Sequence, residues 1–299
     1  MDPAAMTTPR YAVPEGACDC HMHVFGTVER YPPAARRAYT PLPALPALLA
    51  QWRALAARLG VARVVLVQPS AYGTDNRCMV DALQEMGAAA RGIAVIDEDA
   101  PATALDALHA AGVRGIRFNL KTLGDGDAAA LQRRLVRIGE RLMPLGWHVQ
   151  IYADLPLIAA AAEAIRAAPV PVVLDHMGGA RAAPGLAQDG FRTLLDLLGS
   201  GQCWVKLAGA YRVSDAAPGF ADATPIARAL IAANRDNLVW GTDWPHIGDR
   251  AGPATAEPPA AVYRDLDAGH LLDLLAAAAG DEATFHRILV DNPARLYFR

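Results

Sequence analysis

The stretch Cys18-Asp19-Cys20-His21-Met22-His23-Val24-Phe25 decides how the fold is interpreted. It is a short, mostly apolar run that ends in a pair of histidines. The first strand of an open doubly wound sheet is usually followed by a glycine-rich, phosphate-binding turn. This strand leads into His21-Met22-His23 instead, which favours a different parallel architecture.

The same alternation repeats along the chain, with a short apolar run followed by an Ala/Leu-rich amphipathic stretch. Parallel strands that are buried on both faces read as continuous apolar runs, and strand–helix alternation predicts right-handed βαβ units. Repetition of such units favours an α/β fold, a distorted (β/α)8 TIM barrel. The predicted strands are 18–25, 63–69, 92–96, 115–118, 148–152, 170–175, 203–207 and 238–241. The predicted helices are 45–59, 76–90, 102–111, 128–142, 155–167, 190–198, 226–233 and 271–279.

The whole chain, residues 1–299, is expected to form a single barrel domain. No linker rich in Gly, Ser or Pro divides it, and its length is ordinary for a barrel. Residues 1–12 are expected to form a flexible arm. The Pro- and Ala-rich loop 248–261 is expected to cap the barrel mouth, and 292–297 to dock as a C-terminal segment.

Composition excludes several classes of protein. The 28 basic and 31 acidic residues give a net charge of −3, and no Lys/Arg run stands out. Neither a nucleic-acid nor a membrane partner is therefore expected. The N-terminus lacks an apolar core typical of a signal peptide, and no apolar stretch is long enough to span a bilayer. The four cysteines are interpreted as small buried thiols of a cytoplasmic protein.

Barrel enzymes place their chemistry at the C-terminal ends of the strands, and several polar residues fall there. His21 and His23 are two residues apart and share one face of the first strand, where they could bind a metal or polarise a substrate oxygen. His176 follows the sixth strand and is either a core residue or part of the site. Asp243 follows the eighth strand and suits a general base, the alternative being a cap of a loop or helix.

Two arginines also follow strands. Arg117 ends the fourth strand and Arg212 follows the seventh. Surface ion pairs would explain each of them separately. Aimed together into one pocket, they indicate a substrate that carries a carboxylate, because the guanidinium fork matches that group.

Four motifs taken together resemble one family. They are 18–26 (CDCHMHVFG), 114–119 (RGIRFN), 174–178 (LDHMG) and 240–246 (WGTDWPH), supported by Gly73-Thr74-Asp75-Asn76. From about Tyr11 to Tyr297 the chain is similar to the amidohydrolase-2 family of the amidohydrolase superfamily, and within it to the 2-pyrone-4,6-dicarboxylate lactonases.

The resemblance implies a distorted (β/α)8 barrel that hydrolyses a lactone, an EC 3.1.1-like carboxylic ester hydrolase. Asp243 would activate the water, and His21, His23 and His176 would polarise the lactone carbonyl. Substrate binding would fall to Tyr39, Ser70, Arg117, Tyr152, Arg212 and His246.

Two departures from that pattern concern the substrate. The lactonase pattern has an arginine where this chain has Gly179, and another in the stretch where only Lys121 is available. Those arginines help to hold two carboxylates. An anionic lactone with one carboxylate, or a neutral lactone, is therefore expected instead.

The metal question is judged at the fifth strand. Metal-dependent members of the superfamily add a histidine at its end, where this chain has Tyr152. His21, His23, His176 and Asp243 could hold one zinc or manganese ion, as the alternative. The lactonase relatives work without metal, so no cofactor is expected to be required.

Other functions remain open at this point. A sugar-acid lactone isomerase or a metal-dependent decarboxylase could use the same barrel, although the decarboxylase would want the missing strand-5 histidine. A catalytically inactive scaffold is the third alternative, and the intact histidines and Asp243 argue against it. The expected partner is a small-molecule lactone.

Overall fold

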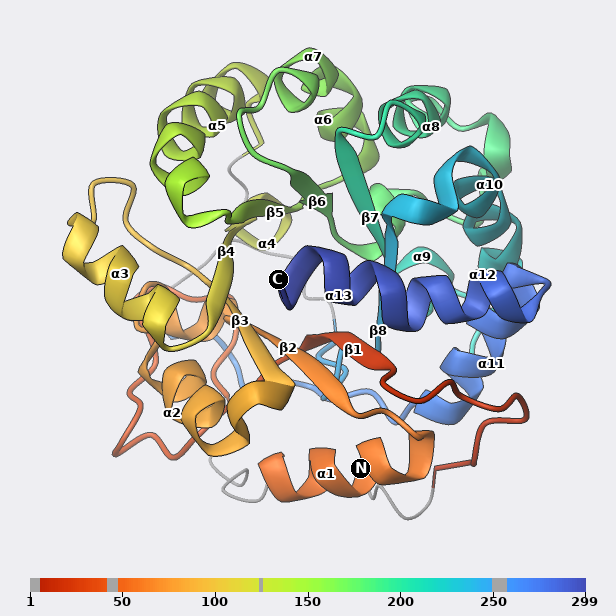
Figure 1. Cartoon of the computed structure of the whole chain (residues 1–299), viewed down its shortest axis with the longest axis horizontal. Helices are drawn as coiled ribbons and strands as arrows, with labels where there is room; N and C mark the ends of the chain where they lie inside the picture. The colour runs from red at the N-terminus through yellow and green to blue at the C-terminus, as the bar shows by residue number, and fades with distance from the viewer. Residues whose placement is uncertain (1–5, 42–47, 124–125, 249–256) are drawn as a thin grey trace.

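Eight parallel strands form the centre of the molecule and follow one another in chain order around a nearly closed barrel (Figure 1). The structure is a computed structural model that describes residues 6–41, 48–123, 126–248 and 257–299. The predicted single-domain (β/α)8 barrel is confirmed. The strands are β1 Cys18–Met22, β2 Arg63–Val67, β3 Ala90–Ala94, β4 Val113–Asn119, β5 His148–Tyr152, β6 Val172–Leu174, β7 Cys203–Ala208 and β8 Leu238–Gly241.

Helices surround this barrel, mostly where the apolar periodicity predicts them. The predicted helix 155–167 is split at Ala161, whose ψ of 10° is not helical. The loop predicted at 248–261 lies largely outside the described residues, as does the start of the helix predicted at 45–59. The helices that fall in the predicted stretches are α1 Leu48–Leu59, α2 Arg77–Met86, α3 Ala102–Ala110, α5 Ala128–Leu142, α6 Leu155–Ala160, α7 Ala162–Arg166, α8 Phe191–Gly199, α10 Thr224–Asn234 and α11 Ala268–Ala279.

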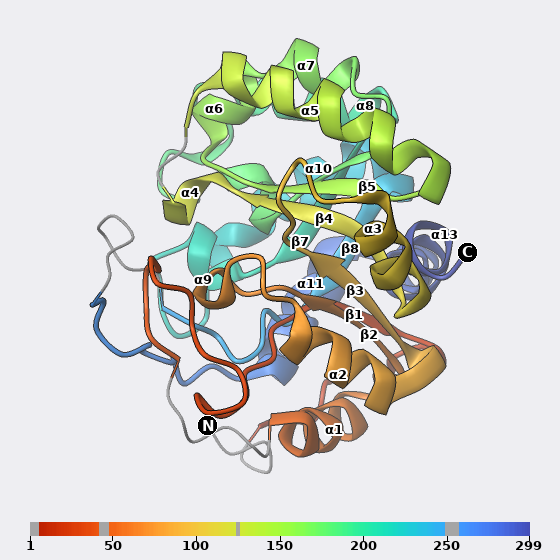
Figure 2. The ribbon, with the colours of Figure 1, turned by 90° about the vertical axis from the view of Figure 1, so that its left-hand side faces the viewer.

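Four short helices were not predicted, namely α4 Leu120–Leu123, α9 Ala210–Val213, α12 Glu282–His286 and α13 Asn292–Tyr297. They are too short to show a helical period in the sequence. Figure 2 shows α4 and α9 at one end of the barrel and α13 at the other. Among the described residues, no helix has the length and apolar character needed to cross a membrane.

The seam between β1 and β8 closes the barrel irregularly. The register of β1 against β2 shifts between Asp19 and Met22, and Met22 forms an isolated bridge with Trp244. The Asp19 carboxylate joins the two sides by accepting hydrogen bonds from the Thr242 backbone N–H (2.9 Å) and hydroxyl (2.6 Å). A bulge of this kind re-aims side chains, and it lies directly before His23, which lines the barrel mouth, whereas His21 lies below the mouth.

The opposite end of the barrel is filled by side chains. Cys18 and Cys20 share an interior cluster with Tyr297 of α13. The Tyr297 ring packs edge-on against His148 at 5.3 Å. The predicted docking of 292–297 is therefore found as a helix across the base of the barrel (Figure 1).

The beginning of the described chain lies against α11. Thr7 donates to the Asp267 carboxylate from its backbone N–H and its hydroxyl, and the backbone N–H of Arg10 donates to Asp273. Flexibility of residues 1–12 stays a prediction, and residues 1–5 lie outside the described part.

Candidate active site

A cavity of about 400 Å³ opens at the C-terminal ends of the strands. Two of the four predicted catalytic residues and five of the six predicted substrate-binding residues line it. These are His23, His176, Tyr39, Ser70, Arg117, Tyr152 and Arg212, joined by Asn119, Lys121, Thr122 and Asp154. The structure therefore brings these side chains, predicted at strand ends, together around one space.

Asp243 lies beneath the floor of this cavity and is fully buried. Its Oδ2 accepts hydrogen bonds from the Tyr211 hydroxyl and from Nε of Arg212, the latter at 2.6 Å. Its Oδ1 has no hydrogen-bond partner in the described structure. One oxygen is thus held in place, and the other is buried without a hydrogen-bond donor among the described residues.

Two imidazoles face Oδ1 of Asp243. Nε2 of His21 lies 3.5 Å from Oδ1 of Asp243, and Nε2 of His23 lies 3.6 Å from it. His21 is fully buried and does not line the cavity, whereas His23 does. Of this pair, His23 is the histidine placed to touch a bound molecule.

The tautomer of His23 follows from its other nitrogen. Nδ1 lies 2.7 Å from the carbonyl oxygen of Val67, and a carbonyl only accepts hydrogen bonds. Nδ1 therefore carries the proton, and Nε2 of the neutral ring is an acceptor. His176 has a looser contact of 3.4 Å from Nδ1 to the carbonyl of Ala208, so either of its nitrogens can donate.

Burial and charge set the protonation states. Burial lowers the pKa of both His23 and His176 to about 4 and that of His21 well below its usual value. Burial by itself would raise the pKa of Asp243, but Arg212 and the histidines outweigh it and hold that pKa well below its usual value. At neutral pH the site consists of a carboxylate beside neutral imidazoles.

The cations of the cavity surround one aromatic ring. The guanidinium carbon of Arg117 lies 5.4 Å from the centre of the Tyr152 ring, Lys121 Nζ lies 5.6 Å from it and the guanidinium carbon of Arg212 lies 6.0 Å from it. Each cation also has a carboxylate partner, with Lys121 Nζ 2.7 Å from Asp154. Tyr39 and Ser70, which also line the cavity, form a hydrogen-bonded pair.

His246 lies outside this cavity. It is fully buried, and its ring lies edge-on to Trp244 and Tyr211. Its predicted role in substrate binding stays a prediction. Its φ of 61°, like the 60° of Asp243 and the 49° of His176, lies in the left-handed region, where strained residues gather at functional sites.

Several polar residues under the cavity were missed by sequence reasoning. Lys206 and Gln150 are fully buried, and Asp175 lies with them inside the barrel. The missed signal was a lysine and a glutamine in the apolar strands CWVKLA and HVQIY, because such residues are seldom buried without a partner. Tyr211, which holds Asp243, carried no such signal.

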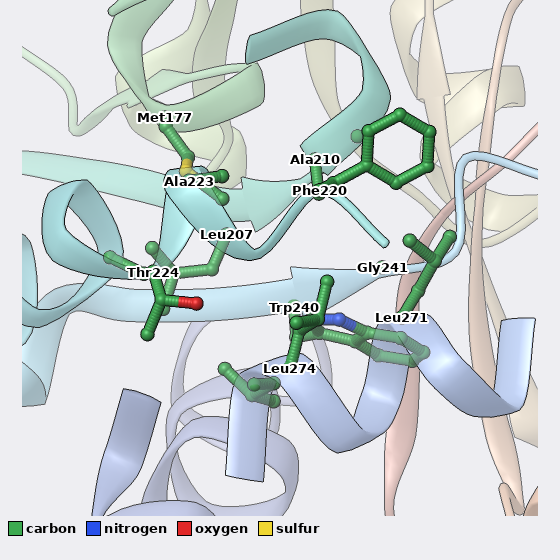
Figure 3. A pocket seen from close by; sticks show the side chains of 13 residues that line it. Met177, Leu207, Ala210, Phe220, Ala223, Thr224, Trp240, Gly241, Leu271 and Leu274 are labelled. Carbon is green, nitrogen blue, oxygen red and sulfur yellow. The ribbon is translucent and has the colours of Figure 1, made fainter. Parts of the chain in front are cut away.

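A second, small cavity of about 30 Å³ lies outside the barrel wall, between β7, β8, α10 and α11 (Figure 3). Apolar side chains such as Met177, Leu207 and Trp240 form its lining, and Thr224 supplies one hydroxyl. It has the size of about one water molecule and brings no charged group together. It is a packing gap beside the site.

The buried donors fit a metal ion by type. Two groups have ligand atoms within 4.8 Å of one another, one formed by His21, His23 and Asp243 and the other by His21, Asp175 and His176. Imidazole nitrogen and carboxylate oxygen suit zinc or manganese, and Asp243 Oδ1 and both His21 nitrogens lack hydrogen-bond partners among the described residues. The alternative metal site is therefore compatible with this geometry.

Comparison with known proteins decides the family. A family model described as amidohydrolase matches residues 18–299. The chain belongs to the amidohydrolase family. This confirms the resemblance that the strand-end motifs indicated.

The names of several relatives of this amidohydrolase describe enzymes that act on lactones. It is 36% identical to a 2-pyrone-4,6-dicarboxylate hydrolase of Comamonas testosteroni over 97% of this chain and 92% of that protein. It is also 36% identical to a 4-sulfomuconolactone hydrolase of Rhizobium radiobacter, over 99% and 94%. A D-galactarolactone isomerase of Agrobacterium fabrum is 31% identical over 97% and 94%.

The amidohydrolase also has a close structural counterpart. An apo crystal structure of an Agrobacterium tumefaciens protein superposes with a TM-score of 0.80 at 29% identity. The match covers 97% of this chain and 98% of that one. The likeness therefore extends across the whole barrel.

Proposed function

We propose that this amidohydrolase opens a lactone ring by hydrolysis, with Asp243 as the base. The observation that carries the proposal is the asymmetry of the Asp243 carboxylate. Oδ2 is fixed by Tyr211 and Arg212, while Oδ1 lacks a partner among the described residues and faces Nε2 of His21 and His23. Such a carboxylate, ionised at neutral pH, is arranged to take a proton from a water molecule.

The reaction then follows from the positions of the side chains. Asp243 removes one proton from water, the water oxygen bonds to the lactone carbonyl carbon, and the ring C–O bond breaks. The proton held by Asp243 passes to the ring oxygen that leaves, which yields an open-chain acid. His23 lines the cavity and can accept a hydrogen bond at Nε2, so it helps to hold the water.

The remaining histidines are assigned by their access to the cavity. His21 does not line the cavity. We therefore propose that His21 accepts a hydrogen bond from Asp243 once this carboxylate has taken a proton, and that it does not touch the substrate. His176 and the Arg212 guanidinium line the cavity, and we assign them to the carbonyl oxygen, which becomes negative during the attack. Donors that are already positioned there are usually the largest catalytic contribution.

A substrate with a single carboxylate fits the charges of the cavity best. Arg117 offers its guanidinium to the cavity, whereas Lys121 is already paired with Asp154. No side chain can be added at Gly179, since its φ is +71° and a Cβ would lie 2.4 Å from the carbonyl oxygen of Ala153. A second carboxylate would therefore meet Asp154 without an arginine to bind it.

We further propose that the reaction needs no metal. The support is the Tyr152 side chain at the end of β5, and the neutralisation of Asp243 by Arg212 and Tyr211. If one zinc or manganese ion is bound, His21, His23, His176 and Asp243 would hold it, and it would polarise the carbonyl and acidify water. The cytoplasmic location expected from the sequence likewise stays a prediction.

Isomerisation of a lactone is the second candidate, favoured by the D-galactarolactone isomerase among the relatives. In that reaction a hydroxyl group of the substrate, rather than water, would attack the carbonyl. The same base and donors would serve it. The two reactions differ in that only hydrolysis releases a new carboxylic acid.

A panel of lactones with no, one or two carboxylates tests these proposals by proton release at constant pH. The greatest rate is expected with one carboxylate. Product analysis by NMR separates ring opening from isomerisation without net acid. Failure of every lactone, with the Asp243→Asn protein as the blank, would reject the proposed function.

A further inference from the structure

Asp175 is a fully buried carboxylate that follows β6 and contacts both Arg117, which lines the cavity, and His21, which lies beside Asp243. Its Oδ2 lies 3.2 Å from Nε of Arg117, and its Oδ1 lies 3.5 Å from Nδ1 of His21. We propose that Asp175 is a positioning residue, which sets the orientation of the substrate-binding Arg117 and of His21 together. The kinetic consequences rest on the proposed lactone hydrolysis, whereas the contacts do not.

The first contact orients Arg117 from behind. Oδ2 of Asp175 accepts hydrogen bonds from Nε of Arg117 and, at 2.9 Å, from Nε2 of Gln150. Arg117 is almost fully buried and still lines the cavity. With Nε held by Asp175, the terminal nitrogens of the guanidinium are left to bind a carboxylate in the cavity, and less side-chain freedom is lost on binding.

The second contact selects the tautomer of His21. Nδ1 of His21 and Oδ1 of Asp175 face each other at 3.5 Å, and neither atom has a closer hydrogen-bond partner in the described structure. Nε2 faces the Asp243 carboxylate at the same distance of 3.5 Å, and the neutral ring can donate to only one of the two. We assign the proton to Nδ1 and the lone pair to Nε2, because Asp175 stays ionised whereas Asp243 takes a proton from water in the proposed reaction. That lone pair points at Oδ1 of Asp243, 3.5 Å away, where it can accept a hydrogen bond once Asp243 has taken a proton from water.

Two residues beneath Asp175 hold it in place. Nζ of the buried Lys206 donates to the Cys20 carbonyl at 2.8 Å and to Oε1 of Gln150 at 2.7 Å, and it lies 3.7 Å from Oδ1 of Asp175. Because Oε1 of Gln150 faces the lysine, its amide nitrogen must face Asp175. This network explains why an apolar strand carries a lysine with no exposed surface.

Asp175→Asn tests the proposal, since it keeps the shape of the side chain and removes the charge. The substitution weakens one charge-assisted contact with Arg117 and one with His21. Each loss is expected to change the corresponding parameter, KM through Arg117 and kcat through His21, by roughly 10-fold. The KM of a monocarboxylate lactone should rise and that of its neutral analogue should not, while kcat should fall for both. Binding of 2-furoate, measured by calorimetry, should weaken, and the ¹⁵N signals of His21 should show loss of the Nδ1–H tautomer.

Asp267→Asn is the matched control, since Asp267 caps α11 and bonds to Thr7, away from the cavity. It should lower thermal stability and leave KM and kcat unchanged. If Asp175→Asn does not fold, Gln150→Met should show the same pattern to a smaller degree.

Two results would overturn the inference. One is an equal change in KM for the charged and the neutral lactone, and the other is unchanged furoate affinity with an unchanged His21 spectrum. If the wild-type protein opens no lactone, the proposed function is rejected, but the positioning role of Asp175 is not. The furoate and NMR measurements would still decide the role of Asp175.

Discussion

The backbone N–H of Asp243 donates a hydrogen bond to the carbonyl oxygen of His21 at 2.8 Å. Two residues after His21 and one residue after Asp243, the His23 N–H donates to the carbonyl oxygen of Trp244 at the same distance. These bonds belong to the seam between β1 and β8, so the contacts that close the barrel also place the base beside the histidines. The same hydrogen bonds therefore close the barrel and hold the residues of the site together.

Gly241→Ala should disrupt both the closure of the barrel and the candidate site. A Cβ at this position would lie 2.5 Å from the backbone nitrogen of His21 and 2.7 Å from its Cβ. Such overpacking is expected to lower the free energy of unfolding by about 1–3 kcal/mol and to displace His21, which urea unfolding and kcat would report. Gly199→Ala, whose new methyl would meet nothing closer than 3.9 Å, should be neutral or stabilising, and equal effects of the two would contradict the argument.

Much of this fold could be predicted because each strand and each long helix carries its own local pattern. The strands β5 and β8 and the helix α5 have the predicted bounds. β1 ends at Met22 instead of Phe25. Its register against β2 shifts after Asp19, whose carboxylate bonds to the distant Thr242, and no local sequence pattern shows such a contact. α13 contains only Asn292–Tyr297, and such a short segment is fixed by its packing on the barrel rather than by periodicity.

The site was predictable to the extent that it follows strand ends. His23, His176, Arg117 and Arg212 line the predicted mouth. The sequence could not show that His21 and Asp243 lie below that mouth, because depth depends on the stagger of the strands. Nor could it pair Lys206 with Gln150 across the interior.

Asp243→Asn is expected to abolish turnover while the protein stays folded. Asparagine tolerates the left-handed backbone that Asp243 adopts, with φ 60°, but it cannot accept a proton from water. A fall in kcat of roughly 1,000-fold or more is expected, in line with losses of 10²–10⁴ for a general base. Unchanged circular dichroism would show that the fold survives, and an unchanged kcat would refute the assignment of the base.

Arg117→Met should separate charged from neutral substrates. Methionine keeps much of the apolar stem and removes the guanidinium that lines the cavity. Loss of a charge-assisted hydrogen bond, worth about 1.5–3 kcal/mol, should raise the KM of an anionic lactone by roughly 10-fold or more. The KM of the neutral analogue should change little, and parallel increases for both would argue against a carboxylate subsite.

Removal of metal should leave the activity intact. We expect protein dialysed against a chelator to keep its kcat, because Asp243 is already ionised and oriented by Arg212 and Tyr211. Metal analysis of the same sample must accompany the assay. Activity that is lost and then restored by zinc or manganese would favour the alternative site formed by His21, His23, His176 and Asp243.

The stability of the folded protein should fall below neutral pH. Burial lowers the pKa of His23, His176 and His246 to about 4, whereas an unfolded histidine titrates near 6.5. Between these values the unfolded chain binds protons that the folded protein excludes, so the free energy of unfolding decreases as the pH falls from about 6.5 to about 4. Asp243, whose pKa is held below its usual range, contributes stability that is lost only at lower pH.

Urea unfolding at several pH values measures this effect. His246→Asn should reduce the slope by up to one proton, about 1.4 kcal/mol per pH unit, and asparagine suits the left-handed φ of 61° at this position. A pH-independent free energy of unfolding across that range would contradict the burial of neutral histidines.

Helix α13 fills the base of the barrel, where Leu296 and Tyr297 pack among the interior side chains of the strands. Molecules therefore enter and leave the candidate site through the same mouth. The acid formed by ring opening must depart before another lactone can arrive, and it retains the carboxylate that Arg117 binds. Accumulating product should act as a competitive inhibitor, and progress curves should slow well before the lactone is exhausted.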